Sequence, residues 1–135
     1  MICKYFKIQE LVSPDVYKRM GDNAWWLFDP RLLQAADIIR QKFGTMIIND
    51  WSWGGQFRFR GLRSIIDSQA PKADFSLHRF GMAIDCHFKS VSVSTVRKYI
   101  IDNPSEFPDI KGIELDVSWL HFDTRNANRL ITFKG

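Results

Sequence analysis

The strongest folding signal in the chain is a helix that begins at Asp29 and Pro30. Aspartate is a good helix N-cap, and proline suits the first helical turn. The apolar residues that follow recur at helical spacing and form one stripe, which comprises Leu32, Leu33, Ala36, Ile39 and Phe43. Gly44 then supplies a stop. Because a single apolar stripe must be buried against other elements, this helix requires a fold with a packed core.

Further signals predict two more helices and several short strands. The Ser-Pro pair at residues 13–14 predicts a short helix, and Ser92 or Ser94 caps a third helix that ends at Asn103. The segment 58–74 contains glycine, proline and many polar residues, so we expect it to be mostly loop. Strand-like apolar segments cover residues 46–48, 82–88, 112–116, 119–123 and 130–133, of which 112–116 and 119–123 form two strands or one bent strand.

Helices therefore collect in the first third of the chain, and strands follow with one helix among them. This order predicts an α+β fold with a central, largely antiparallel sheet flanked by helices. The chain has 135 residues, 45% of them hydrophobic, which suits one globular domain that spans residues 1–135. We expect this domain to be a monomer.

Charge and hydropathy argue against several classes of partner. The net charge of +4 is modest, and the basic residues are spread from Lys4 to Lys134 without a dense run, so we expect no nucleic acid partner. The apolar runs are too short for a membrane span or a secretory signal, which predicts a protein that is cytoplasmic at synthesis. Cys3 and Cys86 lie far apart in the chain, and we expect both to be reduced.

Three residues form a candidate metal site: His78, Asp85 and His121. Two imidazoles and one carboxylate suit a single zinc ion, and three protein ligands leave a fourth position open for water, as a hydrolytic site requires. His87 alternates with Asp85 along the predicted strand and is a further candidate for the same face, whereas Cys86 should point into the core.

The residues around this trio form two extended motifs. Residues 76–85 match the pattern S-x-H-x-x-G-x-A-x-D, and residues 119–125 match W-x-H-x-D-x-R. Together they resemble the zinc D-alanyl-D-alanine carboxypeptidases and endopeptidases that act on bacterial peptidoglycan, and most of all the short, phage-encoded branch of that family. This family shares its fold with the lysostaphin-type peptidases and the hedgehog signalling domain. The resemblance covers the chain from residue 76 onward, while the first half is similar only in the order of its elements.

The resemblance implies that His78, Asp85 and His121 are the zinc ligands, with Ser76 and Asp123 orienting the imidazoles. The family commonly places a catalytic acid three residues before the last histidine ligand, to move the proton of the attacking water. Ser118 occupies that position here. The nearest carboxylates are Asp116, which we expect to replace the acid, and Glu114, which is the alternative; on strict alternation Asp116 falls on the face opposite His121.

A cation that stabilises the oxyanion is also implied by the resemblance. The sequence Gly-Leu-Arg-Ser at residues 61–64 is similar to the family's arginine element, which favours Arg63 over its rival Arg58. Aromatic and amide side chains near these elements are candidates for the walls of a substrate cleft, namely Trp51, Trp53, Gln56 and Trp119.

The function implied is hydrolysis of peptide bonds in peptidoglycan by a zinc metallopeptidase, as a D-Ala carboxypeptidase or as an endolysin-type endopeptidase. Such an enzyme would reach the cell wall through a phage holin or as part of a phage particle. Two alternatives remain: a catalytically inactive, zinc-containing structural or wall-binding protein of a phage particle, which Ser118 would permit, and a nucleic-acid binder that uses Arg58, Arg60, Arg63 and the tryptophans.

Overall fold

A computed structural model describes residues 3–67, 69–71 and 73–135. The α-helices of this part of the chain are α1 (Pro14–Met20), α2 (Pro30–Phe43) and α3 (Val93–Asp102). The strands are β1 (Met46–Ile47), β2 (Ala83–Phe88), β3 (Gly112–Leu115), β4 (Leu120–Asp123) and β5 (Ile131–Lys134). Across the described residues, no helix combines the length with the apolar character that a membrane span needs.

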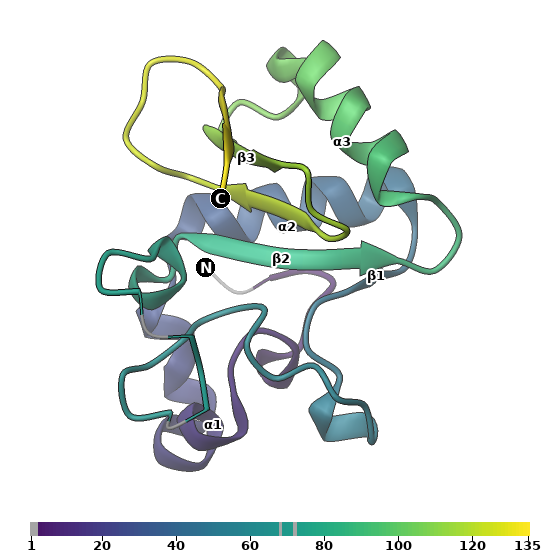
Figure 1. Ribbon diagram of the computed structural model, residues 1–135. Coiled ribbons are helices and arrows are strands. Elements are labelled where there is room, and N and C mark those ends of the chain that lie inside the picture. Colours follow the sequence, from purple (N-terminus) through teal and green to yellow (C-terminus); the bar gives the residue numbers. More distant parts are fainter. Residues whose placement is uncertain (1–2, 68, 72) are drawn as a thin grey trace.

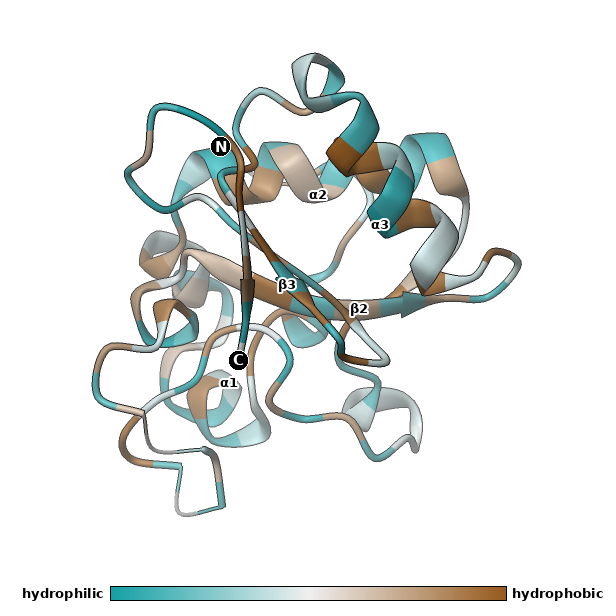
Figure 2. Ribbon diagram, turned by 45° about the horizontal axis from the view of Figure 1, so that its top comes forward, coloured by the Kyte–Doolittle hydropathy of each residue, from teal (hydrophilic) through white to brown (hydrophobic). Residues whose placement is uncertain are grey.

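The five strands form one sheet in the order β1-β2-β4-β3-β5. Every neighbouring pair is antiparallel except β3 and β5, which are parallel. The predicted α+β fold with a central, largely antiparallel sheet is therefore confirmed. In Figures 1 and 2, α2 and α3 lie on one side of the sheet, whereas α1 and the long connection between β1 and β2 lie on the other.

The two faces of the sheet differ in chemistry. On β2, the alternate residues Ile84, Cys86 and Phe88 are buried in the same core cluster as the apolar stripe of α2. This confirms that Cys86 points into the core and that the stripe is buried, with Phe43 packed partly exposed against it. The residues of β2 that alternate with these side chains, including Asp85, are therefore free to form a site on the opposite face.

The helix starts follow the predicted caps. Ser13 accepts a hydrogen bond from the Val16 amide, and Asp29 accepts one from the Arg31 amide. At the third helix the cap is Ser92 rather than Ser94. Each helix start is set by the residue that directly precedes the helix and accepts a hydrogen bond from an amide two or three residues further on, which explains why local sequence signals were sufficient.

The strands differ from the predictions in detail. Segments 112–116 and 119–123 form two strands, separated by a turn in which Asp116 has a φ of 61°. Segment 130–133 becomes β5 and pairs in parallel with β3, and Ile48 lies outside β1 although it is fully buried. The predicted loop 58–74 is confirmed for its described residues; Ser68 and Lys72 fall outside them.

Candidate metal centre

Strand pairing aligns four side chains in a row that runs across the strands on one face of the sheet. This transverse row comprises Asp85, His121, Glu114 and Phe133. Asp85 on β2 pairs directly with His121 on β4. Gly112 and Ile113 of β3 pair with Asp123 and Phe122 of β4, so the next residue in this register, Glu114, stands opposite His121; Glu114 in turn pairs with Phe133 on β5. The four side chains of this row line one cavity of about 320 Å³.

His78 joins the row from a short 3-10 helix, η4 (Leu77–Phe80), that precedes β2. Gly81 makes the connection possible: its φ is 67°, and any side chain there would overlap the carbonyl oxygen of Leu27. His78, Asp85 and His121 are only 3%, 6% and 8% exposed, respectively. One potential ligand atom from each residue lies within 4.8 Å of the other two, so the predicted trio is brought together as a group that could hold a metal ion.

Each imidazole is held in place through the ring nitrogen that faces away from Asp85. His78 Nδ1 lies 3.0 Å from the Gly61 carbonyl oxygen, and His121 Nε2 lies 2.9 Å from Asp123 Oδ2. The other two nitrogens face Asp85, with His121 Nδ1 2.9 Å from Oδ1 and His78 Nε2 3.3 Å from Oδ2. Metal-bound histidines usually donate their second ring N–H to a carbonyl or carboxylate. This arrangement therefore fits a metal ion held by His78 Nε2, His121 Nδ1 and an Asp85 oxygen.

Burial and charge set the protonation of these groups in the metal-free protein. Burial opposes a charge on His121, but the carboxylates of Asp123 and Asp85 outweigh it and raise the pKa of His121 to about 9. Burial also opposes a charge on Asp85, yet its contacts with His121 and His78 lower the pKa of Asp85 well below its usual range. Asp85 and His121 therefore form a charged pair at neutral pH, and a metal ion would compete with the proton on His121.

Of the two residues predicted to orient an imidazole, Asp123 does so and is itself anchored. The Arg125 guanidinium donates to both Asp123 oxygens, at 2.8 Å from Nε and 2.7 Å from Nη2. A side chain at Gly112, the partner of Asp123 on β3, would overlap the Asp123 carboxylate. Ser76 lines the cavity, but among the described residues neither imidazole bonds to it.

The structure separates the two candidate arginines. Arg63 lines the cavity, donates from Nε to the Phe59 carbonyl at 2.7 Å and places Nη2 3.2 Å from Asp85 Oδ2. Burial lowers the pKa of Arg63. Arg58 instead lines a different surface hollow with Asp15 and is not among the residues around the trio.

The two candidate acids are also separated. The side chain of Asp116 is 68% exposed and does not line the cavity, and its Oδ2 lies 3.1 Å from Lys134 Nζ. Glu114 does line it, in the same row as His121. Strict alternation expects Asp116 away from the face of His121, and the structure does place Asp116 outside the cavity. The same count would also exclude Glu114 from that face, and there it fails because the chain reverses between β3 and β4. The register places Glu114 and His121 on one face, and the left-handed φ of Asp116 directs the chain into the turn.

The predicted cleft residues are divided in the same way. Trp119 lines the cavity, whereas Trp53 and Gln56 are exposed on a separate segment and do not line it. Trp51 donates its indole N–H to the Val12 carbonyl, also away from the trio. The His87 ring packs at a tilt against Phe57, and its Nδ1 lies 2.6 Å from Arg60 Nη1, so His87 is not part of the metal group of the described residues.

Three parts of the site were not assigned a role from the sequence. The Gly61 carbonyl is a backbone group, so no residue pattern signals it. Arg125 is the last residue of the second motif, and its spacing of two from Asp123 in that motif was the available signal. Phe133 packs edge-on against His121, with ring centroids 5.6 Å apart, and reaches the site only through the parallel pairing of β5.

Comparisons with known proteins returned no relatives of this chain. No protein-family model matches it, and neither the curated proteins nor the solved structures include a significant match.

Proposed function

We propose that this protein is a zinc-dependent peptidase that hydrolyses peptide bonds in bacterial peptidoglycan. The observation that carries the proposal is the transverse row, in which a carboxylate suited to acid–base work stands beside a candidate metal trio in one cavity. The two motifs that resemble the zinc D-alanyl-D-alanine peptidases supply the substrate class.

Zinc is the metal that best suits the donor set. Two imidazole nitrogens and one carboxylate oxygen are ligands that zinc accepts readily, and catalytic zinc sites characteristically have three protein ligands. A zinc ion held in this way would leave one coordination position for water and lower the pKa of that water, which supplies a nucleophile at neutral pH. The contacts from Gly61 and Asp123 support this assignment, because they hold both imidazoles in the orientation that ligation requires.

Glu114 is the residue that we assign to proton transfer. Its carboxylate lines the cavity in the same row as His121, where it can accept the proton of the attacking water and pass it to the leaving amine. Asp116 could take this role only if the turn between β3 and β4 moved, because its carboxylate is exposed and paired with Lys134. We therefore propose Glu114, which the sequence offered as the alternative to Asp116, as the proton-transfer residue.

Arg63 is the residue that we assign to the scissile carbonyl. Its guanidinium lies at the edge of the trio, and the Phe59 carbonyl fixes its Nε. A partly buried cation at the edge of the site can polarise the carbonyl and stabilise the oxyanion that forms during attack. Trp119 and Phe75 line the same cavity and would contact the residues that flank the scissile bond.

The test is the release of new amino groups from purified peptidoglycan. The zinc-loaded protein should release them, chelation should stop the release, and readdition of zinc should restore it. His121→Ala should be inactive while it remains folded. If the folded, zinc-loaded protein releases no amino groups from walls of several cross-link types, the peptidase proposal fails.

One observation favours a second function, a zinc-containing structural or wall-binding protein without catalysis. Ser118 stands where the resembling family commonly has its acid, and it is exposed. This function predicts zinc binding and wall binding without turnover, and a loss of stability on chelation. The amino-group assay separates the two functions, because both predict bound zinc.

A further inference from the structure

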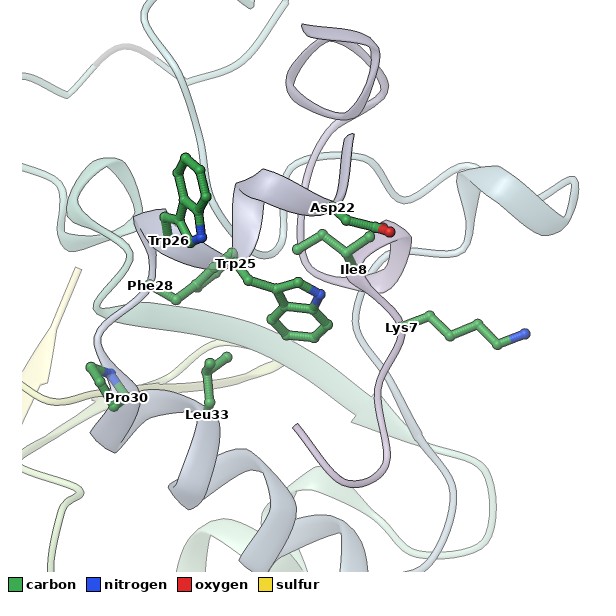
Figure 3. A pocket seen from close by; sticks show the side chains of 8 residues that line it. All are labelled: Lys7, Ile8, Asp22, Trp25, Trp26, Phe28, Pro30 and Leu33. Atoms are coloured by element: carbon green, nitrogen blue, oxygen red, sulfur yellow. The ribbon is translucent and has the colours of Figure 1, made fainter. Parts of the chain in front are cut away.

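A second cavity, of about 620 Å³, lies away from the metal centre and shares no lining residue with it. Figure 3 shows it between the 3-10 helices η1 (Ile8–Glu10) and η2 (Gly21–Leu27) and the start of α2. Its volume falls within the range of about 300–1,000 Å³ that is usual for small-ligand sites.

The cavity has an apolar floor and an aromatic rim. Ile8, Phe28 and Leu33 are buried and form part of the lining. Trp25 is half-buried against the core, whereas the neighbouring Trp26 is 77% exposed. In Figure 3 the two indoles project from η2 in different directions beside the hollow. An indole that is left in water next to a concave apolar surface provides a flat face on which a ligand can stack.

Three polar groups of the lining are without a hydrogen-bonding or ionic partner among the described residues. In the described part of the chain, the indole N–H groups of Trp25 and Trp26 and the carboxylate of Asp22 make no hydrogen bond or ion pair. Lys7 supplies the cationic side chain of the lining, and its ammonium lies 6.0 Å from the ring centroid of Trp53. The two indole N–H groups can donate hydrogen bonds to a ligand, and the Asp22 carboxylate can accept them. Because the charges of Lys7 and Asp22 balance, the lining suits a ligand that is polar at its edges but carries no net charge.

We propose that this cavity binds an N-acetylated hexosamine unit of a glycan chain. A sugar ring has an apolar C–H face that would stack on the Trp26 indole, and hydroxyl groups at its edge that would reach Asp22 and the indole N–H groups. The acetamido methyl group would lie on the floor formed by Phe28 and Leu33. The site needs neither the metal nor the peptidase activity, and it would hold the protein on a glycan strand.

Charge argues for a glycan over a nucleic acid. Binding to single-stranded nucleic acid combines aromatic stacking with a positively charged groove that follows the phosphates. Here the described residues of the lining include one lysine and one aspartate but no arginine. A phosphate backbone would gain little from such a surface.

Isothermal titration of the full chain with a tetramer of β-1,4-linked N-acetylglucosamine tests the proposal. The wild-type protein should bind with a Kd on the order of 0.1–1 mM. Trp26→Ala should weaken binding by about tenfold or more, because stacking is lost, and Trp26→Phe should restore part of it. Phe80→Ala removes another exposed aromatic side chain, which does not line this cavity, and should bind like the wild type. Asp22→Asn should weaken binding with a smaller effect than Trp26→Ala.

Each contrary result has a defined meaning. The proposal is overturned if the folded wild-type protein does not bind the tetramer, if Trp26→Ala binds it as well as Phe80→Ala does, or if chelation abolishes binding. It is also overturned if a single-stranded oligonucleotide binds at this cavity and displaces the sugar. The amino-group assay on the same preparations keeps the two proposals apart: loss of sugar binding with intact hydrolysis defeats only this inference, and the reverse defeats only the peptidase.

Discussion

His121 Nδ1 lies 2.9 Å from Asp85 Oδ1, and the two residues face each other across the β2–β4 pair. Asp123 holds the opposite nitrogen of the same ring at 2.9 Å. The imidazole is thus fixed between two carboxylates. Whatever cation lies between His121 and Asp85, a proton or a metal ion, must satisfy the same pair of atoms.

Metal affinity should therefore rise with pH. Two carboxylates raise the pKa of His121 to about 9 in the metal-free protein, although burial opposes them, so the imidazole is protonated at neutral pH and a metal ion must displace that proton. From neutral pH up to about 9, the apparent affinity for zinc should increase roughly tenfold per pH unit. Calorimetry in buffers of different ionisation enthalpy should report about one proton released per zinc bound near pH 7. A flat affinity profile between pH 7 and 9 would contradict this assignment.

Asp123→Asn should weaken zinc binding without removing a ligand. The amide cannot orient His121 as the carboxylate does, and loss of such an outer contact typically costs about 10- to 100-fold in metal affinity. The substitution also leaves the Arg125 guanidinium with a weaker partner, so some loss of stability is expected. Competition against a chromophoric chelator measures the affinity. Asp116→Asn is the matched control, since its carboxylate is exposed and outside the cavity, and it should bind zinc normally.

Glu114→Gln should reduce the rate of peptidoglycan hydrolysis by about a hundredfold or more, because the amide cannot accept a proton. Zinc affinity should change little, since Glu114 is not one of the three clustered ligands. Asp116→Asn should retain activity within about twofold of the wild type, as is usual for an exposed side chain away from the site. Rates of amino-group release at matched zinc loading provide the measurement. If Asp116→Asn lost more hydrolytic activity than Glu114→Gln, Asp116 would be the proton-transfer residue instead.

Gly81→Ala should destabilise the protein by roughly 2 kcal/mol or more. Gly81 has a φ of 67°, and an added methyl group would overlap the Leu27 carbonyl oxygen. Gly54 is the control: it also lies in the left-handed region, with a φ of 89° and a ψ of 4°, but no heavy atom lies within 4 Å of the position that a methyl group would take. Gly54→Ala should cost only the conformational strain, about 1 kcal/mol. Urea unfolding compares the two, and equal losses would show that the contact with Leu27 is unimportant.

Sequence reasoning succeeded where the decisive interactions are local. The caps at Ser13, Asp29 and Ser92 act on amides two or three residues away, so the helix starts were predictable. The trio was predictable because its residues lie within two extended motifs. For the same reason Asp123, two residues from His121 on one strand, was found as its partner.

The sequence was not sufficient where a residue's position in the site depends on how strands that are distant in the chain pair. Whether Glu114 or Asp116 faces His121 depends on the β3–β4 register and on the turn at Asp116, neither of which alternation along the chain can reveal. The contribution of Phe133 depends on the parallel pairing of β5 with β3. Trp53 and Gln56 are near Arg58 in sequence but lie apart from the cavity, because the loop after β1 folds elsewhere.

Equilibrium zinc binding to the wild-type protein and to the single variants His78→Ala, Asp85→Ala and His121→Ala tests the metal centre most directly. The wild type should bind one equivalent of zinc, and each variant should bind it at least about a hundredfold more weakly while circular dichroism reports a folded chain. Phe80→Ala, which lies between the ligands in sequence but is exposed, should bind like the wild type. If Asp85→Ala retains wild-type affinity, or if the wild type binds no zinc, the metal centre assigned to these three residues is wrong.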